Sequence, residues 1–298
     1  MNITNLFCVL FFLLSNALLS AQNNVVTEAN VLISENKINE AKELLISSYK
    51  KQKNPKVTER LGDVYGIEDN WDEASKYYKE LVDTYPENAV YHFKYGGVLG
   101  MIALESKIRA LSVLGDVKKH FKKAAELDPD HLDVRWASVD LYLKLPGILG
   151  GSTNKSRKYS KELASIVPLE GHLSRAFIEM EEGNEELAEV YNKRALDIAF
   201  NNSYPTKSYK RPDIHFRLGK VSAQHNYKTE TGIKHLLIYE ELHTPESIQP
   251  KGNVFYYLAK LYRLQKNKEK ALFYIQKAKE EGNSSETVSE EASLIEKM

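Results

Sequence analysis

The sequence predicts an all-α protein, a right-handed superhelical solenoid of about seven helix hairpins with a C-terminal capping helix. Two observations lead to this fold class. Apolar residues recur at helical spacing through most of the 298-residue chain. A pattern of small and aromatic residues also returns at a period of about 34 residues, which is typical of helical repeats that stack on one another.

The segment 57–88 shows the repeated unit most clearly. Its first helix carries Gly62 among large apolar residues, its second helix carries Ala74 in a similar setting, and Pro86 ends the second helix. Small residues let two helices approach closely, while the large residues around them fill the remaining gaps. We therefore expect a helix hairpin in which Gly62 and Ala74 permit the close approach.

Six further repeats share the register of the one at 57–88. In chain order they are marked by Ala41; by Tyr95-Gly96, Phe121, Ala124 and Pro129; by Trp136-Ala137 and Pro168; by Ala176, Gly183, Ala188 and Ala195; by Leu218-Gly219; and by Leu258-Ala259, Tyr262, Ala271 and Ala278. The third and fourth repeats are longer than the others, and we expect their extra residues between the two helices. The acidic segment 285–298 is predicted to be a solvent-facing capping helix. No linker rich in Gly, Pro or Ser divides the series, so residues 22–298 are predicted to form one repeat domain.

This pattern resembles the tetratricopeptide repeat, which implies a solenoid of helix hairpins. The third and fourth repeats are also similar to a set of exported bacterial repeat proteins. The shared segments are FKKAAELDPDHLDVRW (121–136), LYLKLPGILGGS (141–152) and EGH (170–172). That set is known mainly as repeat proteins without an assigned activity, so the resemblance implies an architecture and no catalytic residues.

Residues 1–21 are predicted to be a signal peptide. Residues 6–14 form an unbroken apolar run that is too short for the ~20 residues needed to span a bilayer. The run has the length of a signal-peptide core, and Ser20 and Ala21 supply small residues for cleavage. The single cysteine, Cys8, lies inside this leader, so the mature chain would suit an oxidising compartment. We expect a periplasmic or secreted protein with no membrane span after cleavage; a retained N-terminal anchor is the alternative.

The glycine-rich segment 145–154, LPGILGGSTN, is predicted to be a bend between helices. The residues before it recur at helical spacing, whereas a phosphate-binding loop follows a strand, and neither nucleotide fingerprint fits its glycines with Lys155. Pro146 ends the first helix, and Ser152 or Thr153 can cap the next one. The alternative is an anion site at that helix N-terminus, formed by backbone N–H groups and Lys155.

Composition and motifs favour neither catalysis nor nucleic-acid binding. The 41 basic and 41 acidic residues cancel, so no net charge attracts nucleic acid or an anionic membrane. The lysine-rich stretch 118–123 is interpreted as a solvated helix face. The eight histidines form no metal-ligand motif, and we expect His225 and His235 to be solvated. No nucleophile motif is present. We therefore expect no enzyme activity, no cofactor and no metal.

A binding surface is then the expected functional site. In this architecture the first helix of each repeat lines the concave face, and the chain lacks the Lys and Asn pair of a carboxylate clamp at the equivalent positions. The last three repeats place aromatic rings and cations there, although packing between repeats is the alternative for each ring. The predicted partner-binding residues are Phe177, Phe216, Lys220, Tyr256, Lys260 and Arg263.

These expectations define a function. The chain is expected to be an exported scaffold that binds a protein or peptide partner in the bacterial cell envelope, through an apolar segment of the partner that carries some negative charge. Two other functions stay open at this stage. One is a glycan-handling accessory protein in polysaccharide uptake or degradation, because aromatic-lined grooves also stack sugars. The other is an enzyme with an unrecognised site.

Overall fold

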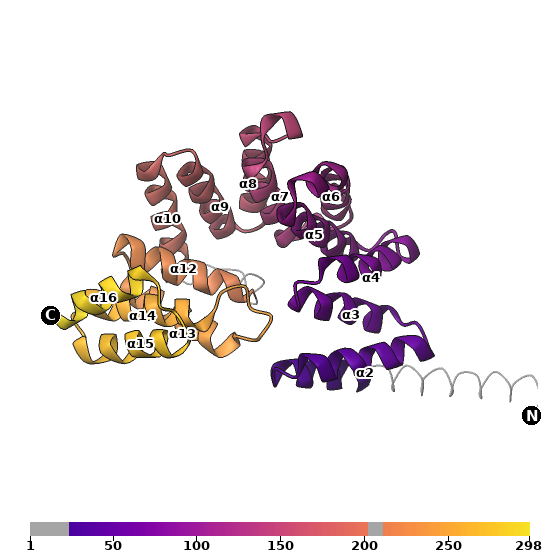
Figure 1. Ribbon diagram of the computed structural model, residues 1–298. Helices are drawn as coiled ribbons and strands as arrows, with labels where there is room; N and C mark the ends of the chain where they lie inside the picture. The colour runs from indigo at the N-terminus through magenta and orange to yellow at the C-terminus, as the bar shows by residue number, and fades with distance from the viewer. Residues whose placement is uncertain (1–23, 202–210) are drawn as a thin grey trace, which may run out of the picture. The chain divides into compact units, whose positions relative to one another are not determined.

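The computed structural model describes residues 24–201 and 211–298, and every regular element in those two ranges is helical (Figure 1). The predicted signal peptide lies outside the described residues. The described helices form seven hairpins and one last helix, as the sequence predicted. In chain order the hairpins are residues 24–34 with α2 (Ile38–Lys51), α3 (Pro55–Ile67) with α4 (Trp71–Thr84), α5 (Ala89–Glu105) with α6 (Lys107–Leu127), α7 (Leu132–Lys144) with α8 (Thr153–Ile166), α9 (Pro168–Glu181) with α10 (Glu185–Phe200), α12 (Pro212–His225) with α13 (Thr229–Leu242), and α14 (Lys251–Leu264) with α15 (Lys268–Glu280); α16 (Glu286–Glu296) follows.

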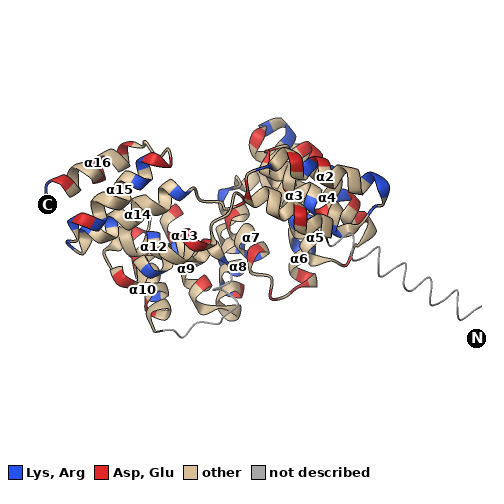
Figure 2. Cartoon of the chain, turned by 90° about the horizontal axis from the view of Figure 1, so that it is seen from below, with Lys and Arg blue, Asp and Glu red and all other residues tan. Residues whose placement is uncertain are grey.

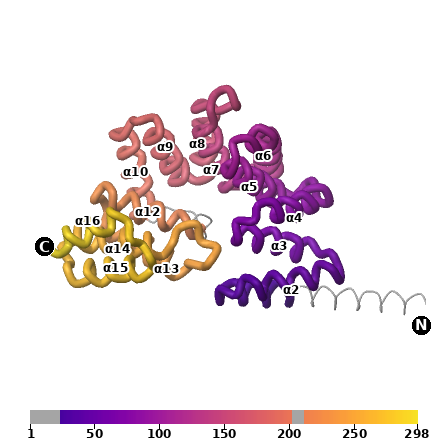
Figure 3. Tube along the Cα trace, viewed as in Figure 1, coloured from indigo at the N-terminus to yellow at the C-terminus, as the bar shows by residue number. Residues whose placement is uncertain are grey.

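The chain divides into two compact units, Met1–Val134 and Arg135–Met298, and the division falls inside α7. We call them the N-terminal unit and the C-terminal unit. Within each unit, consecutive helices run back and forth in adjacent hairpins (Figure 3). Acidic and basic residues are interspersed along the helices of both units (Figure 2). In the described ranges, no helix combines the length and the apolar character that crossing a bilayer needs.

Close packing of the hairpins depends on small residues, as the repeat pattern predicted. A Cβ atom added at Gly62 in α3 would lie 2.7 Å from two ring atoms of Tyr78 in α4. The sixth repeat shows the same arrangement, because a Cβ atom at Gly219 in α12 would lie 2.2 Å from Cγ of Leu236 in α13. Both distances are too short for an undisturbed contact. Glycine therefore sets how closely the two helices of a hairpin approach.

Helix boundaries follow from local capping. Asn54 precedes α3, and its side chain accepts hydrogen bonds from the backbone N–H groups of Lys56 and Val57. Asn70 caps α4 in the same manner by accepting from the N–H group of Glu73. At the other end of the chain, α16 covers the last hairpin with buried residues such as Val288 and Ile295, which belong to the core formed with α14 and α15. The predicted capping helix is confirmed.

The third repeat differs from the prediction. Its extra residues do not lie between the helices but lengthen them, to 17 residues in α5 and 21 in α6, with Ser106 alone between. Ser106 has extended backbone dihedrals, and its hydroxyl accepts from the N–H group of Arg109 at 3.4 Å, so a single residue both ends α5 and caps α6.

The glycine-rich segment is a bend, as predicted. A short 3-10 helix, Gly147–Leu149, follows Pro146, and Gly150 has a φ of +88° that favours glycine. A Cβ atom at Gly151 would lie 1.7 Å from the carbonyl oxygen of Leu145, so the backbone passes too closely there for any side chain. Ser152 then caps α8 by accepting from the N–H group of Lys155. Steric demands of the bend therefore account for Gly150 and Gly151.

Candidate binding surface

A buried carboxylate, Glu170, joins three successive first helices of the C-terminal unit. The residue is 0% exposed and lies in the first turn of α9. Its Oε2 atom accepts a hydrogen bond from Nε1 of Trp136 in α7, and its Oε1 atom accepts one from Nη1 of Arg211, which precedes α12; both distances are 2.6 Å. We call the surface formed by residues 135–144 of α7 together with α9, α12 and α14 the first-helix face.

The charge of Glu170 is compensated inside the protein. Burial is the largest influence and raises the pKa of this carboxyl above its usual value, while the guanidinium of Arg211 and the hydrogen bond from Trp136 act to lower it. Asp213 continues the network, since its Oδ2 atom lies 3.4 Å from Nη2 of Arg211 and 3.6 Å from Nε of Arg217. The guanidinium of Arg217 lies 4.3 Å from the ring centroid of Trp136. Because Glu170 is inaccessible, we assign it a positioning role for these arginines.

Neither Glu170 nor Arg211 was predicted at the site. One signal was available, because Trp136 and Glu170 both lie in the segments shared with exported bacterial repeat proteins, 121–136 and 170–172. However, the hydrogen-bonded pairs are separated by 34 and 41 residues in the sequence. Their contact depends on how successive hairpins stack, and a local sequence pattern does not predict this stacking.

Phe177, Lys220 and Lys260 occupy equivalent positions on this face. Each directly follows a small residue of its first helix, and each is partly exposed. The ammonium group of Lys144 lies 5.8 Å from the ring centroid of Phe177. Lys220 and Lys260 form no ion pair with any residue that the structure describes. One turn beyond Phe177, Met180 is 45% exposed, so α9 presents an apolar pair at helical spacing.

Phe216 is a core residue, which contradicts its predicted availability to a partner. It is 5% exposed and belongs to the main core of the C-terminal unit. Its ring centroid lies 5.5 Å from that of Tyr239 in its own hairpin and 5.6 Å from that of Tyr257 in the next. The packing alternative therefore holds for this ring. Tyr256 is intermediate: it is partly buried, packs against the same core and contacts Tyr257 edge to face.

Arg263 is already paired with the capping helix. Its Nη2 atom lies 3.2 Å from Oε2 of Glu291, its Nε atom pairs with the other carboxylate oxygen, and Glu291 is itself buried. The cation therefore stabilises the packing of α16 on α14. The structure thus leaves Phe177, Lys220, Tyr256 and Lys260 as the partly exposed members of the predicted set.

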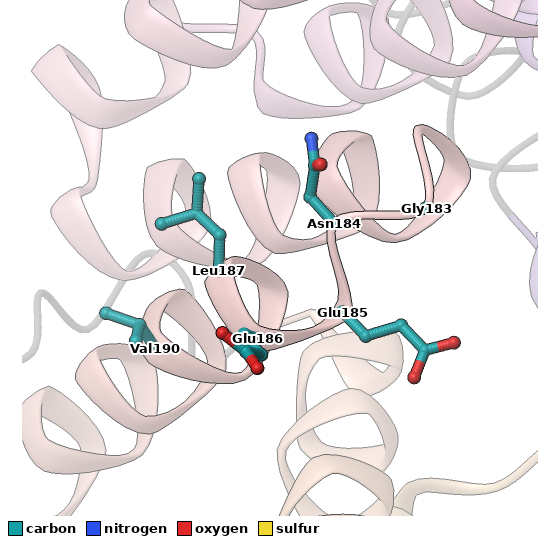
Figure 4. Close-up of a pocket in the computed structure, with 6 residues that line it drawn as sticks. All are labelled: Gly183, Asn184, Glu185, Glu186, Leu187 and Val190. Atoms are coloured by element: carbon teal, nitrogen blue, oxygen red, sulfur yellow. The ribbon is translucent and has the colours of Figure 1, made fainter.

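An open depression lies at the turn between α9 and α10 (Figure 4). Its volume is about 790 Å³, and its lining residues are Gly183, Asn184, Glu185, Glu186, Leu187 and Val190. Gly183 has a φ of +79°, and Nδ2 of Asn184 donates a hydrogen bond to Oε2 of Glu179 at 2.8 Å. None of the predicted partner-binding residues lines this depression. Glu185 and Glu186 lie in the first turn of α10, where negatively charged side chains stabilise the helix.

The histidines also differ from the prediction. His235 is 1% exposed, and its Nδ1 atom lies 2.7 Å from Nδ1 of His215, so the expected solvation of His235 is wrong. His225 is partly buried, and its Nε2 atom lies 3.1 Å from Nδ2 of Asn192. Among the described residues, no group of three or more His, Cys, Asp or Glu side chains could hold a metal ion. Burial lowers the pKa of His235, and its Nδ1 atom is within hydrogen-bonding distance of His215.

Comparison with known proteins identifies the fold. No family model and no curated protein sequence matches the chain. Solved structures do match. A tetratricopeptide repeat protein from Parabacteroides merdae is 14% identical, with a TM-score of 0.47 over 92% of this chain and 98% of that one. A thermophilic tetratricopeptide repeat protein from Thermus thermophilus is 16% identical, with a TM-score of 0.48 over 59% of this chain and 90% of that one.

A third match is to the Cut9–Hcn1 hetero-tetramer of the APC/C. It is 16% identical, with a TM-score of 0.50, and the alignment covers 91% of this chain but 48% of that one. At these identities the likeness concerns the fold alone. The chain has the tetratricopeptide-repeat fold, an all-α solenoid of helix hairpins, as its sequence pattern predicted.

Proposed function

We propose that this chain is an exported tetratricopeptide-repeat scaffold that binds a protein or peptide partner in the bacterial cell envelope. The first-helix face is the proposed binding surface. Export is supported by the apolar run at residues 6–14 and by the absence of cysteine after Cys8. The scaffold role is supported by the fold, whose stacked first helices provide an extended surface for another chain.

The observation that carries the binding proposal is the composition of the accessible part of the first-helix face. Phe177 and Met180 offer an apolar contact on α9, while Lys220 on α12 holds a positive charge with no described ion-pair partner. Most acidic side chains of the same face are paired with cations of the protein: Glu170 with Arg211, Asp213 with Arg217, Asp140 with Lys144 and Glu179 with Arg175. Glu181 is exposed, and it stands against the two lysines without a described ion pair, Lys220 and Lys260. The charge left to a partner is therefore positive.

A partner that complements this surface carries an apolar side chain followed by an acidic one. The apolar side chain would pack on Phe177 and Met180, where a rigid ring provides contact area at small entropic cost. The carboxylate would pair with Lys220 and set the orientation of the segment. The paired rings of Tyr256 and Tyr257 pack on each other and on the core, so no free aromatic platform favours a sugar there.

The experiment is a quantitative comparison of captured partners. The wild-type protein and the Phe177→Ala/Lys220→Glu variant are immobilised and exposed to an envelope extract, and captured proteins are measured by mass spectrometry. A partner of the first-helix face is recovered on wild type and reduced at least tenfold on the variant.

A matched control carries Phe273→Ala and Lys279→Glu on α15. Phe273 is 57% exposed and Lys279 is exposed, so the control makes the same chemical changes on a second helix. Recovery should stay at the wild-type level. Equal recovery on the first variant and on wild type would reject the first-helix face as the binding surface.

A further inference from the structure

The long hairpin of the N-terminal unit ends in exposed apolar side chains. Leu104 in the last turn of α5 is 79% exposed, and Ile108 and Leu111 in the first turns of α6 are 83% and 69% exposed. Only Ser106 separates the two helices, so all three residues lie at the same end of the hairpin. We call Leu104, Ile108 and Leu111 the hairpin tip. Such exposure of neighbouring large apolar residues in a folded protein marks an interaction site.

The tip exists because α5 and α6 are longer than their counterparts. Helices α3 and α4 contain 13 and 14 residues, whereas α5 and α6 contain 17 and 21. At about 1.5 Å per residue, the additional residues lengthen the hairpin by roughly one turn or more. Because Leu104, Ile108 and Leu111 are exposed, packing between repeats does not account for their apolar character.

The charge on α6 indicates what the tip contacts. This helix contains six Lys or Arg residues and two acidic residues, Asp116 and Glu126. Ile108 and Leu111 near the tip are exposed, and so are Lys119 and Lys122 farther along, together with Asp116 and Glu126; Lys122 is ion-paired with Glu126 at 3.5 Å. The outer face of α6 therefore has apolar residues at one end, and the other half of the helix carries four lysines against the two acidic residues, although the chain as a whole has no net charge.

We propose that the hairpin tip and the outer face of α6 dock on an anionic lipid surface. Ile108, Leu111 and Leu104 would enter the boundary between headgroups and acyl chains, and Lys119 and Lys122 would face lipid phosphates. Apolar insertion combined with electrostatic attraction is the mode by which interfacial helices bind membranes. We favour lipid over a second copy of the chain because α6 carries six basic and only two acidic residues.

This role is separate from the proposed binding of a protein partner. The lipid-binding residues lie in the N-terminal unit, whereas the first-helix face lies in the C-terminal unit. Together the two surfaces would hold a captured partner beside a membrane. Each can fail without the other, because their variants do not overlap.

The test places its probe in the hairpin tip. Lipid binding by the apolar run at residues 6–14 would therefore not give the same signal. In the full chain, Cys8→Ser removes the single cysteine, and Ile108→Cys introduces one attachment point for an environment-sensitive fluorophore. The control carries Cys8→Ser and Ile248→Cys, because Ile248 is also 79% exposed but follows α13 in the C-terminal unit. Both proteins are mixed with vesicles of phosphatidylcholine alone or of phosphatidylcholine with phosphatidylglycerol.

We expect a blue shift of the probe at 108 with phosphatidylglycerol vesicles, weakened by added salt, and no shift of the probe at 248. In the chain labelled at 108, Leu104→Ser/Leu111→Ser should weaken vesicle binding of the tip on the order of tenfold or more, because two apolar side chains are lost. Lys119→Glu/Lys122→Glu should abolish the preference for phosphatidylglycerol. Circular dichroism confirms that each variant is folded.

Three results would overturn the proposal. One is the absence of any shift at 108 with either vesicle. Another is an equal shift at 108 and 248, which would mean unspecific adsorption. The third is a shift at 108 that grows with protein concentration without vesicles, which would assign the tip to a second copy of the chain.

Discussion

The Nδ1 atoms of His92 and His120 lie 2.7 Å apart in the third repeat, and both histidines are buried. The Nε2 atom of His92 lies 2.9 Å from the carbonyl oxygen of Pro86, which can only accept a hydrogen bond. The Nε2 atom of His92 therefore carries a proton, and in the uncharged pair the Nδ1–H group of His120 donates to Nδ1 of His92. His215 and His235 repeat this pairing in the sixth repeat, again between a first and a second helix.

These pairs predict that acid weakens the fold. Burial, and then the partner histidine, lower the pKa of His120 to about 4 and that of His235 to about 3. Lys119 and Lys234 act in the same direction, whereas Asp116 and Asp83 oppose the shift at His120. In the unfolded chain both residues titrate near 6.5, so below that pH the unfolded state binds more protons. The contribution of these two histidines to stability is fully present above pH 6.5 and is lost progressively as the pH falls towards 4 and 3.

The free energy of unfolding should therefore fall by up to about 1.4 kcal/mol per pH unit for each of these two histidines between pH 6 and 5. Urea unfolding at pH 7, 6 and 5 measures this change in the free energy of unfolding. The His215→Leu/His235→Leu variant should have a shallower dependence on pH, whatever its stability at pH 7, because one titrating pair is gone. The same dependence in the variant and in wild type would show that His235 is not responsible.

Replacing glycine by alanine should have opposite effects on the free energy of unfolding at Gly62 and at Gly97. Gly62→Ala should lower the free energy of unfolding by about 1–3 kcal/mol, because the new methyl group meets the ring of Tyr78, which is buried and cannot swing away. Gly97→Ala is the control. A Cβ atom there meets nothing within 4 Å, so the variant should gain about 0.5–1 kcal/mol from helix propensity. Equal effects at the two positions would contradict the hairpin packing.

The glycine-rich bend is predicted to bind no nucleotide. Helices lie on both sides of it, and the ammonium group of Lys155 lies 4.9 Å from the ring centroid of Tyr142, so the lysine already has a contact on the preceding helix. Calorimetric titration with ATP and with NAD should show no micromolar binding. Binding that Lys155→Ala removes would restore the anion-site interpretation.

Export predicts a shortened chain. Cleavage after Ala21 would remove Cys8 and leave a protein without cysteine. Intact-mass measurement of the protein from its own cells should give the mass of residues 22–298, in the periplasmic or extracellular fraction. A full-length chain in the membrane fraction would indicate a retained anchor, and a full-length chain in the cytosol would exclude export.

Sequence periodicity was enough to predict the hairpins but not the contacts between them. Gly62 and Ala74 belong to one hairpin, and the repeat pattern predicted that they let its helices approach closely; the structure adds that Tyr78 is the ring packed against Gly62. Phe216, in contrast, was predicted to face the partner because of its position in the first helix of its repeat. Its burial depends on contact with Tyr257 of the next repeat. The pairing of Glu170 with Arg211 likewise requires two successive repeats to stack in a particular way. Stacking is set by the summed shape of many side chains, which no short pattern encodes.

Phe177 and Phe216 provide the sharpest comparison, because the sequence predicted one role for both rings and the structure separates them. Phe216→Ala should lower the free energy of unfolding by about 3–5 kcal/mol, since it opens a cavity between Tyr239 and Tyr257. Phe177→Ala should cost less than about 1 kcal/mol of stability, because the ring is partly exposed. It should instead weaken binding of the captured partner by about 2 kcal/mol or more. Chemical unfolding of both variants, and the affinity of Phe177→Ala for the partner, provide the measurements. If Phe177→Ala unfolds as easily as Phe216→Ala, this ring too is structural; if it folds and binds like wild type, the partner docks away from α9.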